Sequence, residues 1–316
     1  MIPNIPTYRD IDLAHRRIYP FINKTPVLQS RSINQITGAN LFFKCENFQR
    51  VGAFKYRGAT NAIQKLSVED ARNGVVTHSS GNHAQALALA AQVRKIPSYI
   101  VVPENAPKSK IEAVKSYGGI ITYCEATLEA RETTVQKIIE QTGAKLIHPY
   151  DNPDIIAGQG TAAKELILEV GNLDIVIAPV GGGGLLSGTA ISTKSILPGT
   201  IVYAAEPQLA NDAQLSFRTK TLIPSNYPNT IADGLRTSLS ELTFSIILKF
   251  VDDVLTATEE AIVRAMKLIW QRMKVIVEPS AAVPLAIVLE HPDLFENKSV
   301  GIILSGGNVD LDKLPF

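Results

Sequence analysis

Short runs of β-branched and aromatic residues alternate with alanine-rich or amphipathic segments along most of the chain. Eight such runs predict strands, at residues 41–46, 74–80, 98–103, 119–124, 145–150, 174–180, 200–207 and 299–307. Helical patterns lie between them, for example at residues 85–93, 108–117, 128–142 and 157–170. Strands and helices that alternate at this spacing predict βαβ units and parallel sheets. The runs at 174–180 and 300–304 are apolar almost throughout, which indicates strands covered on both faces.

The chain shows no internal repeat, low-complexity tract or polar linker, so we expect interwoven lobes rather than domains in series. The elements between residues 74 and 150 predict one small sheet, and the flanking segments predict a larger one. The sequence therefore predicts an α/β fold of two lobes, each an open, mostly parallel sheet flanked by helices. We expect a large domain formed by 1–73 and 151–316 and a small domain formed by 74–150.

Composition narrows the possible partners. Of 316 residues, 31 are basic and 30 acidic, and this balance favours neither nucleic acid nor an anionic membrane as a partner.

Cys45 and Cys124 lie in apolar runs without metal-like spacing, so we expect buried free thiols in a reducing compartment. The first 17 residues contain charges and prolines rather than an apolar segment, and we expect a cytoplasmic protein. The uncharged stretch 175–193 is interrupted by proline and glycine, so it does not predict a membrane span.

Four consecutive glycines, Gly181, Gly182, Gly183 and Gly184, follow a predicted strand and precede a helix-forming run. Glycines at such a turn let backbone amides converge on an anion, and the helix N-terminus adds partial positive charge. The alternative is a tight turn. Neither the dinucleotide spacing of glycines nor a following Lys-Ser/Thr pair is present, which disfavours a dinucleotide or nucleoside-triphosphate site. The cluster predicts a phosphate-binding loop.

Lys55 stands among small and apolar residues in the segment 52–59, GAFKYRGA. Desolvation lowers the pKa of a lysine and frees the neutral amine that can form an imine. Most lysines are exposed surface charges, so this residue alone leaves both interpretations open.

The segment 77–85, THSSGNHAQ, joins a predicted strand to the next predicted helix. Serine, asparagine and glycine at such a junction usually cap the helix. The same backbone amides can instead bind a substrate carboxylate, and Ser80 offers a hydroxyl for proton transfer. Ser305 follows the last predicted strand in the run SGGN, which by itself predicts only a turn.

Together and in this order, the four motifs resemble those of the fold-type II pyridoxal-phosphate-dependent enzymes, specifically the serine racemase and serine/threonine dehydratase family. The resemblance extends from KTPV at Lys24 to SGGNVD at Ser305. It implies a fold like that of the tryptophan synthase β subunit, a large lobe that binds pyridoxal 5'-phosphate, and a small lobe that moves. It also implies a homodimer.

The resemblance assigns two residues to proton transfer. It implies that Lys55 carries the cofactor as an imine and moves the α-proton of the substrate on one face, while Ser80 acts as acid and base on the opposite face. A hydroxyl that faces the pyridine nitrogen cannot hold it protonated, which weakens the ring as an electron sink and suits elimination more than transamination. The remaining cofactor contacts that the resemblance implies are Phe54 against the ring, Asn82 at the ring oxygen, the glycine loop 181–184 at the phosphate and Ser305 at the pyridine nitrogen.

The substrate carboxylate is expected at Ser79, Asn82 and His83, with Arg131 and His148 as further contacts between the lobes. These assignments rest on the resemblance. From the sequence alone, His83 is equally a residue at a helix start, and Arg131 is equally an exposed helical charge.

Glu206, Ala210 and Asp212 lie close together in AAEPQLAND, which we expect to be a loop after a strand. Two carboxylates and a carbonyl form an oxygen-rich set suited to Mg²⁺, Ca²⁺ or Mn²⁺, whereas the alternative is two exposed acids. The resemblance places a divalent cation at these three positions.

The predicted activity is β-elimination: loss of water from serine, threonine or a related β-hydroxy amino acid, followed by hydrolysis to a 2-oxo acid and ammonia. Two alternatives use the same residues: a serine racemase with dehydratase side activity, and a dehydratase of threo-3-hydroxyaspartate. An alternative from another class is a non-catalytic phosphate-binding protein in which Lys55 is incidental.

Overall fold

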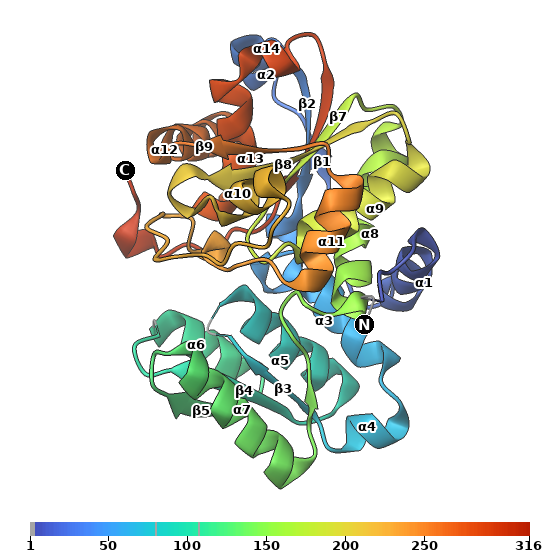
Figure 1. Ribbon diagram of the computed structural model, residues 1–316, viewed down its shortest axis with the longest axis vertical. Helices are drawn as coiled ribbons and strands as arrows, with labels where there is room; N and C mark the ends of the chain where they lie inside the picture. The colour runs from blue at the N-terminus through green and yellow to red at the C-terminus, as the bar shows by residue number, and fades with distance from the viewer. Residues whose placement is uncertain (1–3, 80, 107) are drawn as a thin grey trace.

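The computed structural model describes residues 4–79, 81–106 and 108–316, which form two lobes, each built on its own sheet (Figure 1). In spatial order, the six-stranded sheet of the upper lobe contains β1 (Val27–Leu28), β2 (Asn40–Cys45), β10 (Ser299–Leu304), β7 (Ile175–Pro179), β8 (Ile201–Pro207) and β9 (Asp253–Ala257). The four-stranded sheet of the lower lobe contains β5 (Ile120–Cys124), β4 (Ser98–Pro103), β3 (Val75–His78) and β6 (Lys145–Leu146). All neighbouring strands are parallel except β1 and β2.

Helices cover both sheets. Their bounds are α1 (Tyr8–Ile18), α2 (Arg31–Thr37), α3 (Lys55–Lys65), α4 (Val68–Arg72), α5 (Asn82–Arg94), α6 (Lys108–Ser116), α7 (Leu128–Thr142), α8 (Pro153–Val170), α9 (Gly184–Ile196), α10 (Asp212–Thr219), α11 (Glu241–Phe250), α12 (Glu259–Leu268), α13 (Pro279–Glu290) and α14 (Pro292–Phe295). In the described part of the chain, no helix combines the length and the apolar character needed to span a bilayer.

The topology confirms the predicted α/β fold class. Each of the eight predicted runs contains a strand, and α7 has the predicted bounds. The short strands β1 and β9 were not predicted. Helix α8 begins four residues earlier than predicted because Asn152 caps it, with its side-chain oxygen accepting the amides of Asp154 and Ile155. The two sheets divide the strands as expected at residues 74 and 150, while the domain boundaries themselves stay a prediction.

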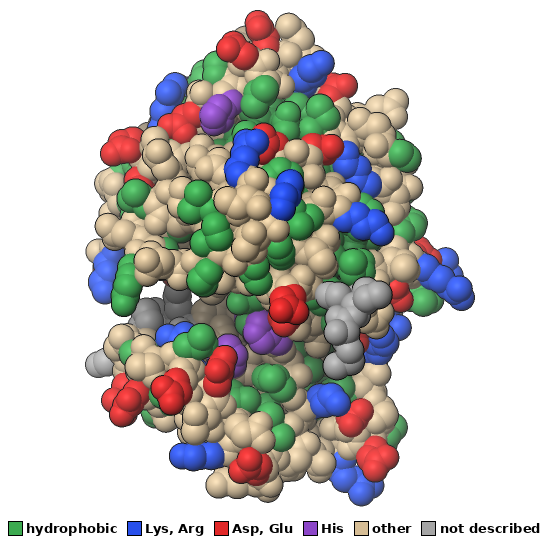
Figure 2. Space-filling model, in the orientation of Figure 1, with side chains coloured by type: hydrophobic (Ala, Val, Ile, Leu, Met, Phe, Trp, Pro, Cys, Tyr) green, Lys and Arg blue, Asp and Glu red, His purple; other side chains and the backbone are tan. Residues whose placement is uncertain are grey.

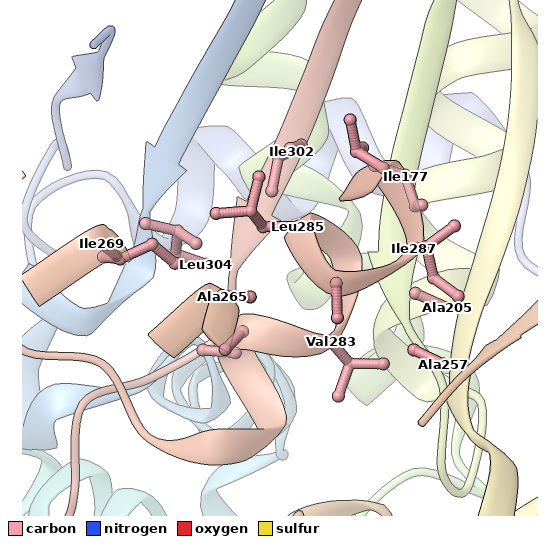
Figure 3. Close-up of a cluster of buried hydrophobic side chains, with 14 of the residues drawn as sticks. Ile177, Ala205, Ala257, Ala265, Ile269, Val283, Leu285, Ile287, Ile302 and Leu304 are labelled. Carbon is pink, nitrogen blue, oxygen red and sulfur yellow. The ribbon is translucent and has the colours of Figure 1, made fainter. Parts of the chain in front are cut away.

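The core of the large lobe lies on both faces of its sheet. Ile177 and Ile302 pack with Leu285 and Ile287 of α13 on one face (Figure 3). The alternate residue Val176 belongs to the cluster on the opposite face, which α8 and α9 cover. Because successive residues of a strand point to opposite faces, burial on both sides requires the continuous apolar runs seen in the sequence.

Helix α3, which begins at Lys55, is fixed tightly against α8. A side chain at Gly158 would bring its Cβ within 2.6 Å of the Cα of Gly58, so only glycine permits this approach. Beside this contact, the fully buried Arg57 forms ion pairs with Glu46 (2.7 Å) and Glu165 (2.8 Å). Although burial opposes it, hydrogen bonds from His15 and Arg57 lower the pKa of Glu165 well below its usual range. These contacts hold the first turn of α3 in one position.

Candidate active site

Lys55 lies between the two lobes, where Figure 2 shows a groove with histidine side chains along it. Its Nζ donates a hydrogen bond to the carbonyl of Pro149, 2.9 Å away, in the segment that leads from β6 to α8. The side chain keeps some contact with solvent, yet burial of the amine lowers the pKa of Lys55 to about 8, and the charge of Glu278 opposes this effect. The neutral amine, which imine formation requires, is therefore far more abundant near neutral pH than in an exposed lysine.

The glycine loop connects β7 to α9, as the sequence predicts. Gly183 adopts a left-handed conformation (φ +86°), and a side chain there would meet Thr243 at 2.8 Å. A side chain at Gly182 would collide with the ring of Tyr150. The loop ends at the N-terminus of a 13-residue helix, where backbone amides and the helix dipole favour a phosphate.

The loop after β10, residues 305–308 (the Ser305 loop), is hydrogen-bonded to the backbone of residues 52–54, just before Lys55. The amide of Phe54 donates to the carbonyl of Ser305 (3.0 Å), and the amide of Gly307 donates to the carbonyl of Gly52 (2.9 Å). Ser305 is buried, and the ring of Phe54 lies 5.2 Å from the Lys55 Nζ. The end of β10 therefore fixes the backbone just before the lysine.

The start of α5, around Asn82, lies on the small-lobe side of the groove. Asn82 is the first residue of α5, and its Nδ2 donates to both carboxylate oxygens of Glu278, at 3.0 and 3.2 Å. His83 is buried, with its Nε2 3.2 Å from the carbonyl of Ile147. The hydroxyl of Ser79 accepts the amide of Gly81 (3.3 Å). Ser80, the predicted acid and base, lies outside the described residues.

A cluster of basic groups forms the small-lobe side of the groove. The rings of His78 and His148 are 5.7 Å apart, and His148 also contacts Tyr150 at 4.6 Å. Burial lowers the pKa of both histidines, that of His148 to about 4, so each is neutral at neutral pH. Arg131 on α7 also lowers the pKa of His78, and its buried Nε makes no hydrogen bond to any described residue. Arg131 is therefore half-buried with an unused donor rather than an exposed helical charge.

Glu206 lies within the strand predicted at 200–207, and neither Glu206 nor Asp212 lies on the loop expected for the cation site. Glu206 belongs to β8, and Asp212 begins α10 after a short 3₁₀ helix that ends at Ala210. The amides of Ala213 and Gln214 each donate to one Glu206 oxygen at 2.8 Å. Burial raises the pKa of Glu206 well above its usual value and that of Asp212 to about 6, and Asp212 Oδ2 makes no hydrogen bond to the described residues. Two desolvated carboxylates with an unused oxygen fit a divalent cation.

The described residues contain no cluster of three or more histidine, cysteine, aspartate or glutamate side chains suited to a metal. The site at Glu206 and Asp212 would depend on two carboxylates and the Ala210 carbonyl, so it stays a proposal. Both cysteines are free and buried, as predicted.

Four site residues were missed from the sequence: His78, Tyr150, Glu278 and Asn308. Glu278 carried a usable signal, because it is a single acid within the apolar segment 275–284, VIVEPSAAVP. His78 carried a weaker one as the last residue of a strand, at the edge where the other motifs gather. Asn308 lies in the SGGN run noted from the sequence but was given no role, and Tyr150 had no local signal.

Comparison with known proteins identifies the family of the chain. The model of the family described as pyridoxal-phosphate-dependent enzyme matches residues 18–306. A beta-hydroxyaspartate dehydratase of Paracoccus denitrificans is 51% identical over 312 residues, which cover 99% of each chain. A serine racemase of Dictyostelium discoideum is 54% identical over 313 residues, covering 98% of this chain and 96% of the relative.

Solved structures give the same result. The crystal structure of serine racemase from Dictyostelium discoideum superposes with a TM-score of 0.94, at 54% identity, and covers 97% of this chain and 99% of that one. The family match confirms the prediction made from the four motifs and removes the non-catalytic alternative. The chain belongs to the family of pyridoxal-phosphate-dependent enzymes.

Proposed function

We propose that the chain catalyses β-elimination of water from a β-hydroxy amino acid and releases a 2-oxo acid and ammonia. The observation that carries this proposal is the position of Lys55, whose desolvated amine donates a hydrogen bond to the carbonyl of Pro149, next to the Tyr150 ring that packs on the glycine loop. The names of the relatives support it, because a dehydratase of a β-hydroxy amino acid and a serine racemase both act at the α-carbon of such substrates.

The residues present fit pyridoxal 5'-phosphate. The backbone of Gly181 to Gly184 would hold its phosphate, Lys55 its aldehyde carbon, Asn82 its ring oxygen and Ser305 its pyridine nitrogen, with Phe54 beside the ring. The bound cofactor supplies an electron sink for the pair left when the α-proton departs.

Proton transfer is assigned to Lys55 and Ser80. The Lys55 Nζ, once released by the substrate amine, takes the α-proton, and its pKa of about 8 suits a base that works near neutral pH. The Lys55 ammonium would return this proton to the departing β-hydroxyl, which leaves as water, and the remaining enamine takes up water to give the 2-oxo acid and ammonia. Ser80 would serve the opposite face of the α-carbon, which racemisation requires and elimination from one enantiomer does not.

Substrate binding is assigned to Ser79, Asn82 and His83 for the α-carboxylate, with Arg131 and His148 as further contacts. A second candidate substrate, threo-3-hydroxyaspartate, is favoured by the basic cluster, because Arg131 has an unused buried donor beside His78. A second carboxylate would form a charge-assisted hydrogen bond there, and a serine or threonine side chain would not.

We also propose a divalent cation, Mg²⁺, Ca²⁺ or Mn²⁺, at Glu206, Asp212 and the Ala210 carbonyl. A homodimer in the cytoplasm, with a mobile small lobe, completes the proposal. Chelation with and without added Mg²⁺, sedimentation velocity and localisation of the tagged chain test these three points separately.

The function is tested by attaching the cofactor and identifying the product. The purified protein is expected to be yellow, and borohydride treatment followed by peptide mass spectrometry should find the cofactor mass on Lys55. Serine enantiomers, threonine and both 3-hydroxyaspartates are then assayed for 2-oxo acid and ammonia. Lys55→Ala should lose both colour and turnover. Lys65→Ala, at the far end of the same helix in an exposed pair with Asp154, should keep both. Turnover by Lys55→Ala without added amine would disprove the assignment.

A further inference from the structure

Glu278 is a buried acid that the proposed chemistry has not used. It precedes α13 as the N-cap residue and is 5% exposed. Its backbone amide donates to the carbonyl of Gly306 (3.0 Å), and a side chain at Gly306 would meet a Glu278 carboxylate oxygen at 2.6 Å. The backbone hydrogen bond of Glu278 therefore holds its carboxylate against the Ser305 loop, and glycine at position 306 leaves room for it.

The hydrogen bonds of this carboxylate determine how Asn82 is oriented. Since an ionised carboxylate can only accept, the two short contacts from Asn82 must come from the Nδ2 of its amide group. The Oδ1 of Asn82 then accepts the Nδ2 of Asn308 at 2.8 Å, and the same Nδ2 donates to the carbonyl of Val51 at 2.8 Å. The four residues form one chain of hydrogen bonds, which runs from Glu278 through Asn82 of the small lobe to the segment before Lys55.

Val51 shows that this chain of hydrogen bonds holds an unfavourable backbone. It is β-branched, yet its φ is +57° and its ψ is +13°, a left-handed conformation that such residues rarely adopt. A conformation of this kind is strained and persists only where surrounding contacts fix it. The bond from Asn308 is such a contact, four residues before the lysine.

Among the described residues, three titratable groups interact electrostatically with Lys55, each from a different element. Glu278 lies at the start of α13, His83 on α5 and His148 after β6. Burial keeps both histidines neutral at neutral pH. Of the three groups, Glu278 is therefore the one whose negative charge raises the pKa of Lys55.

We propose that Glu278 is a positioning residue of the active site, which orients the Asn82 amide and places a negative charge within electrostatic range of the Lys55 amine. This inference rests on the proposed function. A carboxylate near the amine stabilises the ammonium that forms when Lys55 takes the α-proton, and thereby makes Lys55 a stronger base. The same carboxylate directs the Asn82 donor, so one side chain couples the base to the group expected at the ring oxygen.

The test compares Glu278→Gln with wild type and with Glu260→Gln, an exposed acid on α12 that serves as the matched control. Glutamine keeps the size of the side chain and one acceptor for Asn82 but removes the charge. The full chain is freed of cofactor with hydroxylamine, its fold is checked by circular dichroism, and an amine-acylating reagent is applied between pH 6 and 10. Peptide mass spectrometry gives the midpoint of Lys55 labelling. The absorbance of the reloaded proteins is recorded over the same range.

Glu278→Gln is expected to lower the Lys55 midpoint by about one pH unit, the shift typical of losing a nearby opposite charge. Glu260→Gln should leave the Lys55 midpoint unchanged. In Glu278→Gln, but not in Glu260→Gln, kcat should fall by a larger factor than KM changes. Glu278→Asp, which keeps the charge and shortens the reach to Asn82, should label as wild type does, and it serves as the test if the glutamine variant does not fold.

An unchanged midpoint in Glu278→Gln, with cofactor still attached at Lys55, would overturn this inference and leave the proposed function standing. A lowered midpoint in Glu278→Asp would overturn it as well. Failure of wild type to attach cofactor at Lys55 would overturn both.

Discussion

Replacing Gly158 with alanine tests how closely α3 and α8 must approach to hold Lys55 in place. The new Cβ would lie 2.6 Å from the Cα of Gly58 and 2.7 Å from the carbonyl oxygen of Arg57. Both neighbours are backbone atoms, so neither can rotate away as a side chain could. The helices would have to separate, which would also stretch the ion pair between Arg57 on α3 and Glu165 on α8.

Two opposing terms set the magnitude. Alanine is favoured over glycine inside a helix by about 1 kcal/mol. Overpacking in a buried contact typically costs about 1 to 3 kcal/mol, and the upper end applies here because the obstruction is backbone. The clash therefore outweighs the helix propensity, and we expect the free energy of unfolding to fall by about 2 kcal/mol.

The assay is urea unfolding followed by circular dichroism and by the fluorescence of Trp270, the single tryptophan. Gly199→Ala is the matched control, because a Cβ there meets no atom within 4 Å and the residue is exposed. The free energy of unfolding of Gly199→Ala should stay within about 0.5 kcal/mol of the wild-type value. Cofactor bound to Gly158→Ala should also show a changed absorbance, since Lys55 moves with α3. A variant as stable as wild type, or more stable, would refute the argument that this contact is limited to glycine.

Three further outcomes are expected. Glu165→Gln should lower the free energy of unfolding in urea by about 3 to 5 kcal/mol, because it removes the negative charge that pairs with the buried Lys44 and Arg57. The control Glu169→Gln, whose partner Lys24 is exposed, should lower that free energy by less than about 1 kcal/mol. Ser80→Ala should lose racemisation and turnover of D-serine, if wild type has them, and keep dehydration of the L-enantiomer, as measured by chiral chromatography and 2-oxo acid assay; equal loss of every activity with normal cofactor binding would contradict the division of roles. Because the folded form raises the pKa of Asp212 from 3.8 to about 6, it binds that proton more tightly than the unfolded chain does, and the free energy of unfolding falls as pH rises through this window. Added Mg²⁺ should therefore raise the melting temperature more at pH 7.5 than at pH 5, and Glu206→Ala should abolish the difference.

The fold was predictable because its strands are covered on both faces. Continuous apolar runs such as β7 and β10 stand out along the chain, and alanine-rich or amphipathic segments separate the strands. Strand β1 has two residues, too few for local periodicity to detect, whereas β9 was missed although the edge strand β5 was found. The start of α8 depended on a cap, Asn152, that lies outside the periodic segment.

The site was predictable only in part. The glycine loop follows β7 and Ser305 follows β10, and these neighbouring parallel strands bring both positions to one edge of the large sheet. Lys55 and Asn82 were found from their own motifs. The partners that orient them depend on the packing of distant elements. The contact between Asn82 and Glu278 joins residues from different lobes, and Tyr150 is placed over Gly182 by the path of the chain between β6 and α8. No local pattern specifies either arrangement.

The pairing of β2 with β10 determines when the active site can form during synthesis. Asn40 lies opposite Ser299, near the other end of the chain, whereas the strands of the small lobe all come from residues 75–146. The small lobe can therefore fold while the chain is still being made, but β2 and β7 keep exposed edges until β10 leaves the ribosome. Unpaired edges of this kind promote aggregation. A chain stalled or cut before residue 299 would retain the lysine and the phosphate loop yet expose these edges, so we expect chaperone dependence to concentrate on the last stage of synthesis.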